Sequence, residues 1–75
     1  MAIQTSAADI ARSWIQIVRG EFLEIPGLLL TRSQVEHLWG LERDLCDEVL
    51  HGLIESRFLE RTPSGAFVHV DAIRH

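Results

Sequence analysis

The segment from Thr31 to Ser56 constrains the fold most, because it carries the boundary signals of two helices only a few residues apart. Thr31 and Gln34 have the spacing of a capping box, in which each side chain accepts a hydrogen bond from the other residue's backbone amide. Gly40 suits the left-handed conformation in which many helices end. The segment therefore predicts two helices joined by a tight turn over residues 31–56.

The second of these helices is strongly amphipathic. Its apolar residues recur every three or four positions, as expected for a helix that packs on a core. They are Leu45, Cys46, Val49, Leu50, Leu53 and Ile54. The outward side carries four acids against one arginine, and its members are Arg43, Asp44, Asp47, Glu48, His51 and Glu55. The only cysteine lies on the apolar side, which favours a core or boundary residue over a reactive thiol.

Two short alternating segments follow this helix. Residues 58–61 and 66–70 have the pattern of strands, and residues 62–65 between them carry proline in the second and glycine in the fourth position, as in a type I turn. A wing hairpin is therefore expected over residues 57–70. Residues 28–30 are apolar and too few for a helix, so we expect a short buried edge strand there.

Residues 1–25 predict a first helix, capped at Ser6 and ending near Leu23, which is also a candidate dimerisation element. Its apolar residues span an arc of about 160°, wider than one side of a small core requires. Part of this arc is expected to face a second copy of the chain. The candidate dimer-interface residues are Ile10, Trp14, Ile15, Ile17 and Val18. Trp14 is a candidate interface anchor, whereas plain core packing is the alternative for it and for Trp39.

The charge balance of the 75-residue chain bears on its partners. With 11 acids and 7 bases, all arginine, the formal net charge is −4. Nucleic-acid binders neutralise roughly 6 to 10 phosphates, so this balance disfavours nucleic acid unless the arginines cluster. Arg12 and Arg19 lie nearly in line on the first helix, and with Arg32 and Arg57 they are the candidate basic stripe.

The sequence offers no pattern typical of an enzyme, a metal site or a cofactor site. The four histidines are scattered, the glycines stand apart, and the paired acids lie on an exposed helix face. We therefore expect no enzymatic activity, no metal and no cofactor. The single cysteine and the lack of a run of roughly 18 apolar residues predict a cytoplasmic location and no membrane partner.

The order helix, short strand, helix, turn, helix, hairpin resembles the winged helix-turn-helix superfamily over nearly the whole chain. The similarity is carried by Gly40-Leu41, the apolar pairs Leu53-Ile54 and Phe58-Leu59, and the segment Gly65-Ala66-Phe67-Val68. The chain is similar in outline to small bacterial winged helices, including the carboxy-terminal winged helix of the DNA-processing protein A family. The resemblance implies one α+β domain over residues 1–75, mainly α with a small β-hairpin, in which three helices accompany a two- or three-stranded wing sheet.

In DNA-binding winged helices, the third helix enters the major groove and the wing touches the backbone or the minor groove. The resemblance places the candidate partner or DNA face at Arg43, Asp44, Asp47, Glu48, His51, Arg61 and Ser64. Phosphates would repel the acids of this set. Arg57 stands where such domains often carry glycine, so we expect this helix to end differently.

Two functions follow, and both stay open at this point. The first is a non-enzymatic, homodimeric interaction module whose acidic helix binds a protein partner in a regulatory complex. The second is a DNA-binding transcriptional regulator that docks through Arg12, Arg19, Arg32, Arg57 and Arg61. Electrostatics favours the first slightly, whereas the frequency of nucleic-acid binding among winged helices favours the second. Fold alone does not decide function.

Overall fold

The computed structural model describes residues 7–72, which form three helices, a three-stranded antiparallel sheet and a short 3-10 helix. In chain order the elements are α1 (Ala7–Glu24), β1 (Leu30–Thr31), α2 (Arg32–Trp39), α3 (Arg43–Glu55), β2 (Leu59–Arg61), β3 (Ala66–His69) and η1 (Val70–Ala72). The predicted α+β class is confirmed, and the arrangement is compatible with a winged-helix outline. The predicted cap at Ser6 lies outside the described residues.

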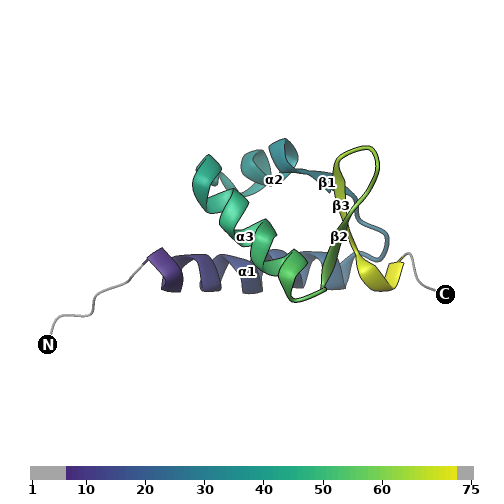
Figure 1. The fold of residues 1–75 in the computed structure, drawn as a ribbon, viewed down its shortest axis with the longest axis horizontal. Helices are drawn as coiled ribbons and strands as arrows, with labels where there is room; N and C mark the ends of the chain where they lie inside the picture. Colours follow the sequence, from purple (N-terminus) through teal and green to yellow (C-terminus); the bar gives the residue numbers. More distant parts are fainter. Residues whose placement is uncertain (1–6, 73–75) are drawn as a thin grey trace, which may run out of the picture.

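Helix α1 lies along one side of the molecule, and α2, α3 and the sheet lie on the other (Figure 1). Buried side chains from all three helices and the sheet meet between them. This core contains Val18, Phe22, Val35, Leu41, Cys46, Val49, Leu50, Leu53, Phe58, Leu59 and Phe67. The Ile15 side chain of α1 packs over Gly52 of α3, where a Cβ atom would lie 2.9 Å from Cδ1 of Ile15.

The capping box and the glycine stop are both confirmed. The Thr31 amide donates to Oε1 of Gln34 at 2.8 Å, and the Gln34 amide donates to Oγ1 of Thr31 at 3.2 Å. Gly40 has φ 63° and ψ 35°, and the next amide, that of Leu41, donates to the carbonyl of Glu36 at 2.9 Å. These local bonds define where α2 begins and ends.

The sheet has the order β1-β3-β2, with Leu30 and Arg61 both opposite Phe67. Its wing turn closes as expected, with a 2.9 Å hydrogen bond from the Gly65 amide to the Thr62 carbonyl.

The predicted strand over residues 28–30 was wrong in extent. The strand begins only at Leu30, and Leu29 is 54% exposed. The reason lies in the preceding turn, since the Leu28 amide donates to the Ile25 carbonyl at 3.1 Å and is still part of it.

Helix α3 ends in the conformation that glycine normally provides, although the residue there is Arg57, with φ 63°. The Arg57 amide donates to the Ile54 carbonyl at 2.9 Å, and the Phe58 amide donates to the Leu53 carbonyl at 3.0 Å. This is the hydrogen-bond pattern of the Schellman motif. The expectation of a different helix end was therefore wrong. The two backbone bonds and the burial of Phe58 outweigh the cost of a side chain in the left-handed region.

Replacing Arg57 with glycine is expected to stabilise the protein by about 0.5–1 kcal/mol. Glycine removes the Cβ clash at positive φ, and its larger unfolded-state entropy offsets part of that gain. Urea unfolding followed by tryptophan fluorescence measures the change. Ser56→Gly is the matched control, because Ser56 has an ordinary φ of −78° and should gain nothing from glycine. Equal stabilisation by both variants would contradict the assignment of strain to Arg57.

Candidate functional site

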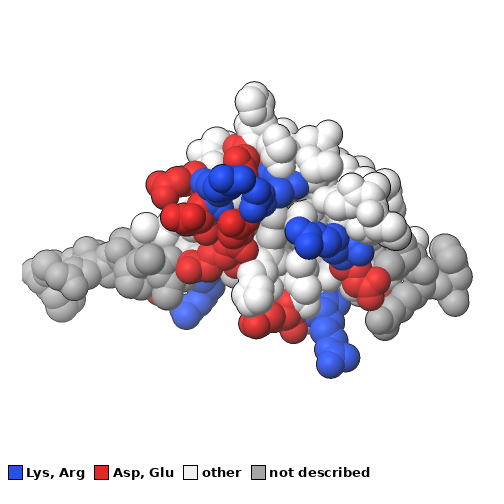
Figure 2. Space-filling model, turned by 45° about the horizontal axis from the view of Figure 1, so that its top comes forward, with Lys and Arg blue, Asp and Glu red and all other residues white. Residues whose placement is uncertain are grey.

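The outer side of α3 carries a concentrated acidic surface, because the opposite side of the helix is buried in the core. All of its charged side chains are exposed. We define the acidic face as Glu42, Asp44, Asp47, Glu48 and Glu55. Figure 2 brings the α2–α3 side of the molecule forward and shows carboxylates gathered around a few arginines. The predicted partner-face residues Arg43 and His51 are also exposed on α3.

Arg32 lies next to carboxylates of the acidic face rather than in a row of basic residues. Its Nη1 atom lies 2.9 Å from Oδ1 of Asp47, and its Nε atom lies 3.6 Å from Oε2 of Glu36. The hydrogen bond to Asp47 raises the pKa of Arg32 above its ordinary value. Arg32 therefore links the start of α2 to α3 and neutralises part of the acidic face.

The remaining acids differ in their partners. Glu55 lies 2.9 Å from Nε2 of His51. Among the residues described, Glu42, Asp44 and Glu48 form no ion pair. Their position near the amino end of α3 is favourable, since negative charge there complements the helix dipole. The carboxylates without an ion pair among the described residues are therefore concentrated at the start of α3, next to the exposed Arg43.

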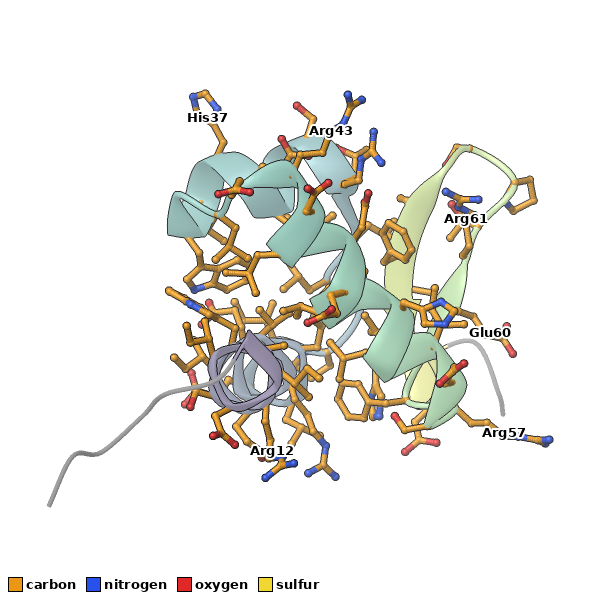
Figure 3. The ribbon with its side chains drawn as sticks, turned by 60° about the vertical axis from the view of Figure 1, so that its left-hand side comes forward. Arg12, His37, Arg43, Arg57, Glu60 and Arg61 are labelled. Atoms are coloured by element: carbon orange, nitrogen blue, oxygen red, sulfur yellow. The ribbon has the colours of Figure 1, made fainter. Side chains whose placement is uncertain are left out.

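The structure brings together two of the four arginines of the predicted basic stripe, since Arg19 and Arg57 line one hollow beside Phe58. In Figure 3, Arg12 points away from α3 on the far side of α1, whereas Arg43 lies on the opposite side of the molecule, and Arg57 and Arg61 lie toward the wing. Arg12 pairs with Asp9 at 3.7 Å. Spacing along the chain does not fix helix rotation and tertiary packing, so it gave no sign that Arg19 and Arg57 line the same hollow while Arg32 pairs with Asp47 of α3.

Two of the arginines stack on aromatic rings of the core. The guanidinium carbon of Arg19 lies 5.1 Å from the centre of the Phe58 ring, and that of Arg61 lies 5.6 Å from the centre of the Phe67 ring. Such cation–π contacts hold a guanidinium against the protein surface. The two side chains thus have structural partners in the core.

The predicted dimer interface on α1 is narrower than expected. Ile10 and Ile17 are 40% and 49% exposed, while Trp14 and Ile15 are half-buried against the core. Including Val18 was wrong, because it is fully buried on the side of α1 that packs inside the chain. Trp39 is likewise half-buried against the core. Self-association stays a prediction, and Ile17 is the exposed residue of the set on which it now rests.

One surface feature was not predicted from the sequence. Where α1 passes the start of α3, an open hollow of about 270 Å³ is lined by Ile10, Glu42, Asp44, Leu45 and Glu48. Ile10 and Leu45 each lie at the margin of an apolar stripe. Periodicity gives no reason to place the two residues together, and only the packing of α1 on α3 does so.

Residues 7–72 contain no group of three histidine, cysteine or acidic side chains arranged to hold a metal ion. Within the same range, no helix is both long and apolar enough to span a bilayer. Comparisons with protein-family models, curated proteins and solved structures gave no match to the chain. The function must therefore be argued from the side chains themselves.

Proposed function

We propose that the chain is a non-enzymatic interaction module whose acidic face binds a basic segment of a protein partner. The observation that carries the proposal is the exposed row of carboxylates that begins at Glu42, the residue before α3, and continues along the helix. Glu42, Asp44 and Glu48 have no ion-pair partner within residues 7–72. Opposite charge steers association and selects partners. A regulatory complex is the setting that the winged-helix resemblance suggests.

The same arrangement weighs against reading DNA with α3. The helix would bring carboxylates close to phosphates, which repel them. Of the nearby arginines, Arg32 is already engaged by Asp47 and Glu36. DNA binding through arginines elsewhere in the chain is the alternative function, and the labelled arginines in Figure 3 point to different sides.

The test is fluorescence anisotropy with a labelled twelve-residue peptide of alternating lysine and serine, at low salt. The unmodified chain is expected to bind it, with an affinity that falls as salt rises. The double variant Asp44→Asn/Glu48→Gln should bind about tenfold more weakly, since one charge contact at about 4 Å is worth roughly 1 kcal/mol even in water. Both residues lack ion-pair partners in the described part of the chain, so the fold should tolerate the change.

The matched control is Glu21→Gln/Glu24→Gln, which removes the same charge from α1, away from the acidic face. Its affinity should stay within about twofold of the unmodified chain, because screened charges outside the contact contribute little. Equal losses in the two variants would mean that only net charge matters. No peptide binding at tens of micromolar would overturn the proposal, and salt-sensitive binding of labelled duplex DNA instead would establish the alternative.

A further inference from the structure

The hollow between α1 and α3 combines an apolar floor with an acidic rim. Ile10 comes from α1 and Leu45 from α3, and both keep part of their apolar surface exposed. Glu42, Asp44 and Glu48 line the same hollow. These three are the carboxylates without an ion-pair partner among the described residues. The described lining contains no basic side chain.

The two helices that form the hollow are held firmly relative to each other. The Ile15 side chain of α1 packs against Gly52 of α3. Buried side chains of both helices, including Val18, Val49 and Leu53, fill the core beneath. The hollow is therefore a preformed feature of the folded chain, which lowers the entropic cost of binding.

The charges around the hollow select its occupant. A symmetric pair of copies uses the same patch on both molecules. A dimer centred on this hollow would therefore bring the three rim carboxylates of one copy against those of the other, which is unfavourable. A segment with an apolar side chain between basic residues is complementary to both the apolar floor and the acidic rim.

We propose that the hollow is the anchor site of the basic partner. An aliphatic side chain of the partner inserts between Ile10 and Leu45, and flanking lysine or arginine residues contact Glu42, Asp44 and Glu48. This inference rests on the proposed function and makes it more specific, because it adds an apolar requirement to a charge requirement.

The experiment compares two labelled peptides of equal charge. One is the lysine–serine peptide described above, and in the other two central serines are replaced by leucines. The leucine peptide is expected to bind about tenfold more tightly, as burial of one aliphatic side chain allows. Ile10→Ser should abolish this preference and leave the affinity for the serine peptide nearly unchanged.

Ile17→Ser is the matched control, since Ile17 is a comparably exposed isoleucine of α1 that does not line the hollow. It should keep the full preference for leucine. Equal binding of the two peptides would overturn the anchor site and leave the charge-based function standing, whereas failure of both peptides would remove both proposals.

Light scattering on the same samples tests whether a second copy of the chain, rather than a basic partner, occupies the hollow. The anchor site requires that Ile10→Ser leaves the molecular mass of the protein unchanged. A dimer that dissociates in Ile10→Ser would show that a second copy occupies the hollow, and this result would overturn the proposal. Circular dichroism should give the same spectrum for both variants, because both residues are exposed; if Ile10→Ser loses helix signal, Ile10→Thr serves as the milder replacement.

Discussion

Replacing Phe22 with alanine is expected to remove about 3–5 kcal/mol from the free energy of unfolding. The side chain is 1% exposed and lies in the core cluster, so its loss removes a large buried surface and leaves a cavity. At about 0.05–0.15 kcal/mol per residue, a chain of this length has little stability to spare. Urea unfolding monitored by tryptophan fluorescence should show a greatly reduced midpoint or an unfolded protein.

Leu23→Ala is the control for this prediction. Leu23 adjoins Phe22 in the sequence but is 53% exposed, so its truncation should cost under about 1 kcal/mol. Phe22→Leu keeps the measurement possible if the alanine variant does not fold. Comparable losses of unfolding free energy in the two variants would mean that Leu23 is also buried, which would contradict the exposed position described for it.

The thiol of Cys46 is expected to react with iodoacetamide at least about a hundredfold more slowly in the folded protein than in the urea-unfolded chain. The residue is fully buried on α3. Burial raises the pKa of the Cys46 thiol to about 11, from an ordinary value of 9.0. At pH 8 the reactive thiolate is therefore rarer by about two powers of ten. Mass spectrometry of alkylated protein over time measures both rates.

The same pKa shift makes stability depend on pH. Because folding raises the pKa of Cys46, the folded state holds the thiol proton more tightly than the unfolded state does. The stabilisation from this linkage is fully present below pH about 9 and is lost as the pH rises through about 11. Cys46→Ala should lack this part of the alkaline decline. Fast alkylation under native conditions, or an unchanged alkaline decline in the variant, would contradict the assignment.

The sequence by itself determined the features that depend on backbone hydrogen bonds between close neighbours. Thr31 and Gln34 close the capping box, Gly40 ends α2, and Gly65 closes the wing turn. Each signal involves residues within about four positions of one another, so it is readable without knowing the rest of the fold. The burial of Cys46 followed in the same way from the apolar stripe of its own helix.

Only the tertiary structure decided which residues of these helices remain exposed and available to a partner. Periodicity placed Ile17 and Val18 on one wide arc, yet the rotation of α1 buries the second and exposes the first. Arg32 pairs with Asp47, fifteen residues away, and Ile10 of α1 lines the same hollow as Leu45 of α3. Such contacts depend on how helices are rotated and spaced against each other. Those quantities follow from the joint packing of all core side chains, which no local pattern contains.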